Sequence, residues 1–423
     1  MKNLFSRFLL VFQDSVLRRR LLFIAFAFVL FRLLAAVPIP GVDHARLAAL
    51  LEGNQFLGLF SIFSGGGFDN LSIVMLGVGP YITASIIMQL LTMVFPKLKE
   101  MYHEEGELGR KKFAQYSRLL TLPLAFISGF GFLVLLSRQG VLGDLTAFGM
   151  LSNMLLVAAG SFLLMWLGEL VTEFGIGSGV SLIIFAGIVA SIPRAVSTLV
   201  LSFDPSQIPL YAAFLFVALA IIYGVIFVSE AERPVPVTYA KRVRGNRLYG
   251  GVSTYLPLRV NQAGVIPIIF ALSILLFPQM ILQFASGVEH AAIQKIAALL
   301  LPFFSAGWLY SFLYFVLVFL FTYFYTAVTF EPESVATNLQ KNGAFIPGVR
   351  PGRATAEHLS KIVTRITLVG AIFLAFVAVL PLAMQGVTGN INLAIGGTAL
   401  LIVVSVVLDL VKKIEAQVAM REY

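Results

Sequence analysis

Long apolar segments recur along the chain, and they restrict its fold more than any other feature of the sequence. A helix needs roughly 20 apolar residues to cross a bilayer, and runs of this kind occur ten times. They lie near Leu21–Val37, Ile73–Phe95, Phe113–Leu136, Leu151–Val171, Val180–Leu199, Leu210–Val228, Ala263–Phe284, Trp308–Phe330, Ile362–Leu382 and Ile391–Leu410. Because 59% of the 423 residues are hydrophobic and only 12% are charged, a soluble globular domain is excluded. We predict an all-α polytopic membrane protein with ten transmembrane helices.

The basic residues are distributed unevenly between the two sides of these spans. All but five of the 30 Lys and Arg residues fall on the side of the N-terminus. The exceptions are Arg46, Arg138, Arg194 and Lys295 in connections on the opposite side and Arg32 inside the first run. Connections that stay in the cytoplasm carry an excess of Lys and Arg. We therefore expect both termini to be cytoplasmic.

The parity of the spans predicts a symmetric architecture. Five runs precede a short extracytoplasmic connection at residues 202–209, and five follow it. Because each group has an odd number of spans, the two groups insert with opposite orientations, which is typical of inverted-repeat transport folds. We predict an N-terminal half at residues 1–201 and a C-terminal half at residues 210–423, joined by a hinge at residues 202–209.

The segment Ser64–Met93 interrupts regular helical structure at the point where a membrane span should begin. It opens with three glycines, continues with the polar pair Asp69 and Asn70, and carries two more glycines and a proline near the start of its apolar run. Irregular backbone at membrane depth is tolerated only where it is buried in protein or lines a water-filled cavity. This segment therefore predicts a pore or a binding cavity.

Two cytoplasmic loops are long and basic. In residues 229–262, β-branched and aromatic residues bracket a basic turn at residues 244–246, a pattern that predicts a protruding hairpin. Residues 331–360 contain a short helical piece followed by the turn-rich IPGVRPG. Basic loops often serve only to enforce topology. Their length and turn chemistry favour a docking surface for RNA phosphates or an acidic partner.

Catalytic chemistry has little support in the sequence. The chain has no Cys and only four His, which lie far apart, and it has no phosphate-binding glycine loop followed by a Lys-Ser/Thr pair. We expect no enzyme activity, no catalytic residues, no metal and no cofactor. Two alternatives stay open: a secondary transporter of small solutes with inverted repeats, and an intramembrane enzyme. Charged residues inside the spans are scarce, which disfavours an ion-coupled carrier.

Several long motifs then carry a resemblance to a known family. GVGPYITASIIMQLL, MWLGELVTEFGIGSG, LPLRVNQAGVIPIIFA and GAFIPGVRPG occur in this order, and together they resemble the SecY family of bacterial protein-conducting channel subunits over nearly the whole chain. The resemblance implies two inverted five-helix halves around a central pore in the bacterial cytoplasmic (inner) membrane. It implies a passive channel for unfolded secretory polypeptides that also releases transmembrane segments laterally into lipid.

The resemblance also implies partners. They are the small membrane subunits SecE and SecG, the SecA motor ATPase, the ribosome, secretory preproteins with their signal peptides, and the lipid bilayer. The motor or the translating ribosome would supply the energy, since the chain has no nucleotide site of its own.

Residue roles follow from the same resemblance. A plug half-helix is expected at about residues 60–72, including Gly65, Gly66, Gly67, Phe68, Asp69 and Asn70. A constriction ring is expected from Val78, Ile82, Val180, Ile184, Ile269 and Ile402. Two pairs within this ring are four residues apart, so each pair projects from one face of a helix. That spacing fits a ring, and it equally fits helix packing or lipid contact.

A lateral gate is expected between the second and third spans on one side and the seventh and eighth on the other. Its polar edge is assigned to Thr83, Gln89 and Asn261, for which local hydrogen bonding between helices is the alternative reading. Docking of the motor and the ribosome is assigned to Arg350 and, less specifically, to Lys241, Arg242, Arg247 and Arg259.

Overall fold

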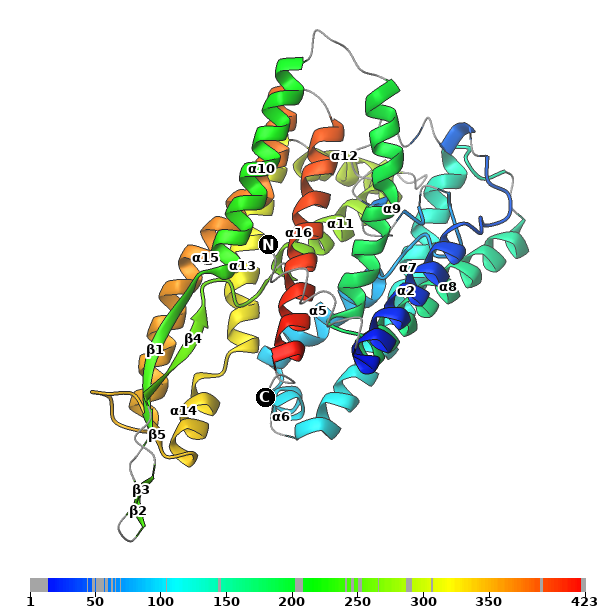
Figure 1. Ribbon diagram of the computed structural model, residues 1–423. Helices are drawn as coiled ribbons and strands as arrows, with labels where there is room; N and C mark the ends of the chain where they lie inside the picture. Colours follow the sequence, from blue (N-terminus) through cyan, green and yellow to red (C-terminus); the bar gives the residue numbers. More distant parts are fainter. Residues whose placement is uncertain are drawn as a thin grey trace. The chain divides into compact units, whose positions relative to one another are not determined.

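The structure is a mostly helical one with a small sheet (Figure 1). The computed structural model describes residues 14–43, 45–47, 50, 57, 60–61, 64, 66–68, 70–103, 105–143, 146–201, 208–239, 242–244, 247–249, 253–264, 266–286, 291–305, 307–388 and 391–419. These residues form two compact units. The first contains residues 1–214, 272–310 and 381–423, and the second contains residues 215–271 and 311–380.

Most helices of the first unit belong to it entirely. They are α2 (Ser15–Ala35), α5 (Gly79–Val94), α6 (Pro96–His103), α7 (Gly106–Arg138), α8 (Ala147–Phe174), α9 (Gly179–Leu201), α12 (Ala291–Ser305) and α16 (Ile391–Ala419). In this unit α7 contacts α5 and α8, and α9 contacts α8 and α16, while α2 contacts α8 and α9. Each of the helices in these contacts therefore buries one side against its neighbours, as Leu17, Ile24 and Phe31 of α2 show, while other apolar side chains stay exposed.

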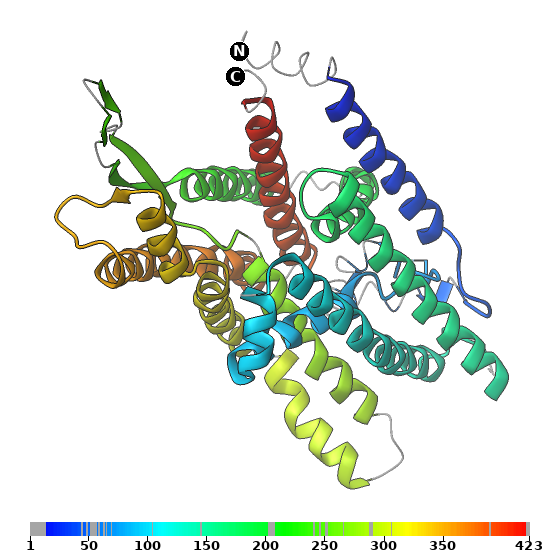
Figure 2. The same cartoon turned by 90° about the horizontal axis from the view of Figure 1, so that it is seen from below.

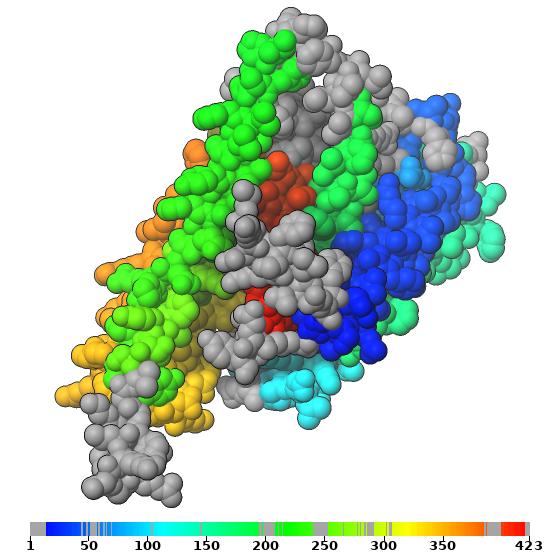
Figure 3. Space-filling model, in the orientation of Figure 1, coloured from blue at the N-terminus to red at the C-terminus, as the bar shows by residue number. Residues whose placement is uncertain are grey.

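Four further helices contribute residues to both units: α10 (Ile208–Glu230), α11 (Ile266–Ser286), α13 (Gly307–Thr329) and α15 (Arg353–Thr388). On α10 the apolar side chains of Phe216, Tyr223 and Phe227 are exposed. Figure 3 shows α10 in green along the surface of the molecule. An exposed apolar face of this size is typical of a helix that contacts lipid or another membrane protein.

The second unit contains the sheet. Its strands β1 (Glu232–Tyr239), β4 (Ser253–Arg259) and β5 (Ala344–Phe345) are antiparallel and pair in the order β4-β1-β5. Beyond them β2 (Arg242–Arg244) pairs with β3 (Arg247–Tyr249), with Arg244 opposite Arg247 (Figure 2). The predicted hairpin is confirmed by this pairing, and residues 245 and 246 of the predicted turn lie outside the described residues. The short helix predicted before IPGVRPG is confirmed as α14 (Pro332–Lys341).

A hydrophobic core joins the sheet to the start of α15. Its buried residues are Val235, Val237, Leu258, Ala344, Ile346, Leu359, Ile362, Val363 and Ile366. Burying apolar side chains on both sides of this contact stabilises the two loops as one folded piece, by about 1.5–3 kcal/mol for each fully buried aliphatic side chain. The two loops predicted from the sequence are thus a single packed subdomain rather than separate connections.

A described helix lies in each of the ten segments predicted to span the membrane. Among described residues, five helices are long and apolar enough to cross a bilayer, or six if α5 and α6, bent by 115° at their junction, count as one span. The chain is therefore a multi-pass membrane protein.

Several predicted boundaries were wrong. Helix α5 begins at Gly79 rather than near Ile73, because residues 73–78 form turns. Helix α15 begins at Arg353, inside the segment 331–360 that the sequence analysis describes as a loop. Helix α12 was not predicted at all.

Candidate functional site

The segment before α5 is irregular, as its glycines and polar residues predicted, and hydrogen bonds hold it in place. The hydroxyl of Ser72 donates to the carbonyl of Gly67 (2.9 Å), and the backbone N–H of Phe68 donates to the hydroxyl of Ser64 (3.0 Å). A Cβ on Gly67 would lie 2.9 Å from the carbonyl oxygen of Val74, closer than real Cβ contacts allow. This turn therefore requires glycine.

Leu71 adopts an unusual backbone conformation in this segment. Its φ is +44°, and it is the one non-glycine residue with positive φ among the residues that the structure describes. The left-handed region costs about 1–2 kcal/mol for a residue with a Cβ. Leu71 is also fully buried, and its carbonyl accepts a hydrogen bond from the N–H of Ile39 (2.9 Å). Strain of this kind persists only where the surroundings over-determine the backbone.

Two strand-like contacts fix the segment to the residues after α2. The N–H of Ile73 donates to the carbonyl of Val37 (3.0 Å), which together with the Ile39 to Leu71 bond makes an antiparallel bridge between Pro38 and Ser72. In this way the end of α2 and the approach to α5 support each other.

Helix α8 holds the same segment from another side. The hydroxyl of Ser161 donates to the carbonyl of Gly77 (3.0 Å), and the side-chain amide of Asn153 donates to the carbonyl of Pro40 (3.2 Å). A Cβ on Gly160 would come within 1.9 Å of the carbonyl oxygen of Ile73, so only glycine permits this approach. Small residues at helix interfaces of membrane proteins allow such close packing, and the run Ala158–Ser161 carries that signal in the sequence.

An aromatic cluster packs the predicted plug segment against α7. The ring centroids of Phe60 and Phe132 are 4.2 Å apart, and those of Phe68 and Phe132 are 5.5 Å apart with the rings at 63°. Tilted and edge-to-face pairs at these distances are favourable. Phe68 and Phe132 are fully buried. Of the predicted plug residues, Gly66, Gly67, Phe68 and Asn70 are described, with Asn70 exposed, whereas Gly65 and Asp69 lie outside the described residues.

Five of the six predicted ring residues belong to the first unit. Val78 caps the start of α5 and Ile82 follows one turn later, both buried. Val180 and Ile184 lie on α9, and Ile402 lies on α16, which contacts α9. Ile184 and Ile402 are almost completely buried. The sixth residue, Ile269, is buried on the part of α11 that belongs to the second unit.

A close approach of α8 and α9 positions Val180. A Cβ on Gly179 would lie 1.9 Å from the carbonyl oxygen of Gly168, and the hydroxyl of Thr172 accepts from the N–H of Gly179 (2.9 Å). Gly177, in the connection, has φ +94°. The glycine-rich motif at residues 165–179 is thus the sequence that allows the start of α9 to rest on the end of α8.

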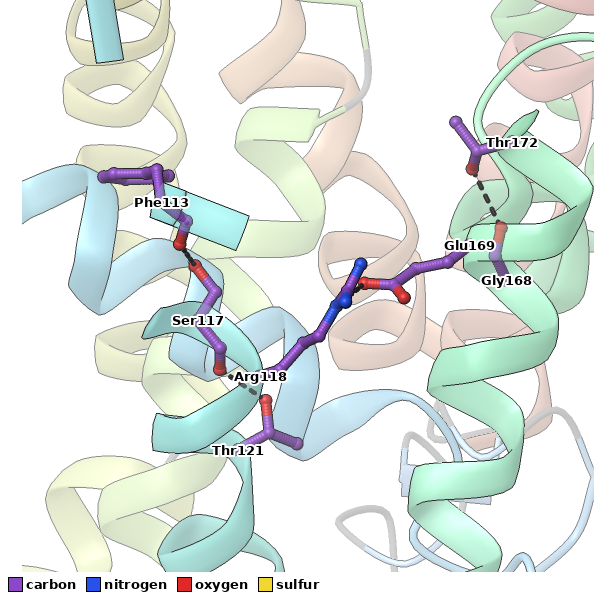
Figure 4. Close-up of polar contacts among 7 residues, drawn as sticks. All are labelled: Phe113, Ser117, Arg118, Thr121, Gly168, Glu169 and Thr172. Atoms are coloured by element: carbon purple, nitrogen blue, oxygen red, sulfur yellow. Dashed lines mark hydrogen bonds and ion pairs between the residues drawn. The ribbon is translucent and has the colours of Figure 1, made fainter. Parts of the chain in front are cut away.

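An ion pair links α7 and α8 (Figure 4). The Nε atom of Arg118 lies 2.8 Å from the Oε1 atom of Glu169, and the side chain of Glu169 is mostly buried. Nearby hydroxyls form only local helix bonds, from Ser117 to the carbonyl of Phe113 and from Thr121 to the carbonyl of Ser117. Charge-assisted bonds of this length are among the stronger ones in proteins. This pair carries no sequence signal, since the two residues are 51 positions apart.

The predicted gate residues make short-range hydrogen bonds. The hydroxyl of Thr83 donates to the carbonyl of Gly79 (3.1 Å), the amide of Gln89 donates to Ser85 (3.4 Å), and the amide of Asn261 donates to the carbonyl of Gly264 (3.2 Å). The side-chain oxygens of Gln89 and Asn261 are buried, and neither has a hydrogen-bond partner among the described residues. A buried acceptor left unpaired costs about 1–3 kcal/mol.

The docking residues differ in how much the structure describes. Arg350 is exposed, and the turns on either side of it use Gly348 and Gly352, both with positive φ. Its carbonyl accepts from the hydroxyl of Thr355 (2.8 Å). Arg259 is exposed at the end of β4. Arg242 lies in β2 opposite Tyr249, Arg247 lies in β3 opposite Arg244, and Lys241 lies outside the described residues.

Comparison with known proteins agrees with these observations. A family model described as SecY matches residues 72–411. The chain is 43% identical to the protein translocase subunit SecY of Mycobacterium leprae, covering 99% of this chain and 98% of that protein. It is 42% identical to the protein translocase subunit SecY of Thermotoga maritima, covering 97% of this chain and 95% of that protein.

Solved structures share the fold at low sequence identity. One, described as a protein conducting channel, has a TM-score of 0.64 at 18% identity and covers 95% of this chain and 93% of its own. A second, a SecY protein whose plug domain is described as stabilising the closed state of the translocation channel, has a TM-score of 0.67 at 20% identity and the same coverage. Sec61 from a canine ribosome-channel complex has a TM-score of 0.61 at 18% identity, with 95% and 93% covered. By its sequence relatives and the matching family model, this chain belongs to the SecY family.

Proposed function

We propose that this chain is the channel subunit of a bacterial protein translocase. It passes unfolded secretory polypeptides across the cytoplasmic membrane and releases transmembrane segments sideways into lipid. Within the family shown by the comparisons, one observation carries the proposal: the irregular backbone at residues 64–78, strained at Leu71 and buried against α7 and α8 at the start of a membrane span. Such a backbone is expected only at a cavity or a protein-lined path through the membrane.

The architecture proposed for this function has ten transmembrane helices in two inverted five-helix halves around a central pore. The halves are residues 1–201 and 210–423, and the hinge is residues 202–209, of which 202–207 lie outside the described residues. A helix in each predicted span supports this count. Both termini are proposed to be cytoplasmic, because the basic loops and the termini share one side.

The plug is proposed to be residues 60–72, with its seat formed by α7 and α8. The aromatic cluster of Phe60, Phe68 and Phe132 supports this assignment, since it ties the segment to α7 through ring contacts. Apolar contacts of this kind can be exchanged for contacts with a passing polypeptide at little net cost. The strained Leu71 favours departure of the segment from its seat, because leaving it relieves backbone strain.

The seal is proposed to be the ring of Val78, Ile82, Val180, Ile184, Ile269 and Ile402. All are apolar, and five of them are buried. A narrow hydrophobic constriction blocks ions by excluding water, and branched aliphatic side chains can fit around a polypeptide of varied sequence. The contact of α9 with α16 supports the part of the ring that comes from these helices.

The lateral gate is proposed to use Thr83, Gln89 and Asn261. The unpaired buried oxygens of Gln89 and Asn261 support this role, because a group left unsatisfied in one conformation is available to a partner in another. A helical signal peptide that separates the gate helices would bring its own polar groups or water to these oxygens.

The docking surface is proposed to be the subdomain built from β1–β5, α14 and the start of α15. Its basic residues Arg350, Arg259, Arg242, Arg247 and Lys241 suit an acidic protein surface or RNA phosphates. The proposed partners are the SecA motor and the ribosome on this surface, SecE and SecG in the membrane, and secretory preproteins with their signal peptides in the pore.

The chain is proposed to have no catalytic activity and to need no cofactor or metal. The comparisons give no support to a transporter of small solutes.

A crosslinking experiment tests the pore. Because the chain has no Cys, Ile82→Cys and Ile269→Cys each introduce one thiol, which we expect to crosslink to a precursor stalled in transit. Ile87→Cys is the matched control, since it lies on α5 about 140° around the helix from Ile82. We expect little crosslinking there. If a precursor is stalled in transit and neither position crosslinks to it, the placing of Ile82 and Ile269 in the pore is contradicted.

A further inference from the structure

Helix α12 is a feature that the channel function does not explain. It has 15 residues, so its length is about 22 Å, too short for a bilayer core of about 30 Å. It joins α11 to α13 and is drawn in yellow-green in Figure 2. Because β4 leads into α11 and α13 leads into α14 and β5, α12 connects the ends of α11 and α13 that are remote from the sheet.

One face of α12 is an exposed apolar stripe. It consists of Ile293, Ile296, Leu299, Leu300 and Phe303. At 100° per residue these positions fall within about 120° of one another around the helix. Ile296 is 58% exposed and Leu299 is 69% exposed, although both are large and aliphatic.

The remaining sides of α12 are polar or buried. Gln294 lies roughly opposite the stripe, and Ala297, toward one flank, is completely buried. Helix α12 has a single charged residue, Lys295, and no acidic residue. The helix thus has one flank against protein, one polar side and one apolar side that nothing in the described chain covers.

The start of α13 indicates where this stripe lies. One residue separates Ser305, the end of α12, from Gly307, the start of α13, which is long and apolar enough to cross a bilayer. Trp308, in the first turn of α13, is 78% exposed. Trp is enriched where a membrane span meets the headgroup layer. The end of α12 is therefore held at the level of the membrane surface by its covalent link to the span.

We propose that α12 is an interfacial helix that lies on the bilayer, with its apolar stripe in the boundary between headgroups and acyl chains. An amphipathic helix too short to span, with a basic residue beside its apolar face, fits that boundary. Lys295 suits anionic lipid headgroups through charge complementarity. The contact holds the remote ends of α11 and α13 at a fixed depth. We place α12 on the extracytoplasmic surface of the membrane, and this placement depends on the topology given under the proposed function.

Single cysteines test this inference in the full chain, in its native membrane assembly. Ile296→Cys and Leu299→Cys report on the stripe, and Gln294→Cys is the matched control on the polar side of the same helix. Each is labelled with an environment-sensitive nitrobenzoxadiazole dye and reconstituted in phosphatidylethanolamine–phosphatidylglycerol vesicles. A nitroxide attached to lipid near the headgroup then serves as the quencher.

We expect blue-shifted emission at both stripe positions, and a loss of emission to lipid nitroxide several-fold larger than at Gln294. Water-like emission at both stripe positions would overturn the proposal. Blue-shifted emission that lipid nitroxide does not quench would also overturn it, since a protein would then cover the stripe. The assay uses no precursor and no motor, so its result is independent of whether the chain conducts polypeptides.

Discussion

The hydroxyl of Ser161 on α8 donates a hydrogen bond of 3.0 Å to the backbone carbonyl of Gly77, one residue before the cap of α5. The two residues are 84 positions apart, and Ser161 is fully buried. This bond fixes the last turn of an irregular segment against a regular helix. It therefore sets the position from which Val78 and Ile82 project.

Ser161→Ala should lower the stability of the chain and make the resting channel leak ions. Removing the donor leaves a buried carbonyl without this partner, at a cost of about 1–3 kcal/mol. Thermal unfolding in detergent and ion flux into proteoliposomes measure the two effects. Ser117→Ala is the control, because Ser117 is also buried and its hydroxyl bonds only within its own helix, to the carbonyl of Phe113. Equal effects of the two substitutions would contradict a special role for Ser161.

Gly160→Ala should prevent α8 from packing on residues 73–74. The new Cβ would meet the carbonyl of Ile73 at 1.9 Å, and backbone atoms must move to avoid it. Overpacking of this kind costs about 1–3 kcal/mol, and sometimes more. We expect a lower melting temperature and a reduced yield of assembled protein.

Gly386→Ala on α15 provides the comparison for that substitution. A Cβ at Gly386 would meet nothing within 4 Å. Alanine favours a helix over glycine by up to about 1 kcal/mol, so this variant should be at least as stable as the wild type. If Gly160→Ala is as stable as Gly386→Ala, then α8 does not pack as closely on the carbonyl of Ile73 as the structure shows.

Leu71→Val should weaken the closed position of the plug. Leu71 has φ +44°, and a β-branched residue tolerates positive φ poorly because its side chain is restricted on both sides of Cβ. Valine keeps the site apolar, so loss of burial is small. We expect more ion leak in the absence of precursor, measured as conductance across a planar bilayer. Leu71→Met, unbranched and similar in volume, should leak no more than the wild type. Equal leak from both variants would mean that backbone strain at this position plays no part.

Arg350→Glu should reduce motor-driven translocation while the protein still assembles in the membrane. Arg350 is exposed, so its loss removes a charged contact surface without disturbing packing. Translocation into inverted membrane vesicles, together with the amount of assembled protein, gives the measurement. Lys112→Glu on α7 is the control for charge, because it lies outside the docking subdomain: its partner Glu105 lies 3.8 Å away, and both side chains are exposed. An exposed pair contributes about 0–1 kcal/mol. Normal translocation by Arg350→Glu would rule out the docking role.

Much of the fold could be predicted from the sequence because a bilayer leaves few choices. Apolar runs of membrane length must be helices or barrel strands, since hydrocarbon cannot satisfy a free backbone, and a described helix lies in every predicted segment. The pairing of β2 with β3 in a hairpin could be predicted from local turn chemistry. The amphipathic α12 was missed because its apolar run is interrupted and too short for a span.

The site depended more on tertiary structure. The sequence by itself determined that regular structure is interrupted before residue 73, because glycines and polar residues interrupt the apolar pattern there. Residues 73–78 were expected to be helical, and the structure holds them as turns instead. The sequence could not determine which distant residues hold that segment. Phe132, Ser161 and Gly160 do so from α7 and α8.

The physical reason is that an irregular backbone has no pairing rule of its own. Its polar groups must find partners elsewhere in the chain, and only the packed structure decides which ones. The sequence therefore determined where helical structure is interrupted, and the tertiary structure decided which distant residues hold the interrupted segment.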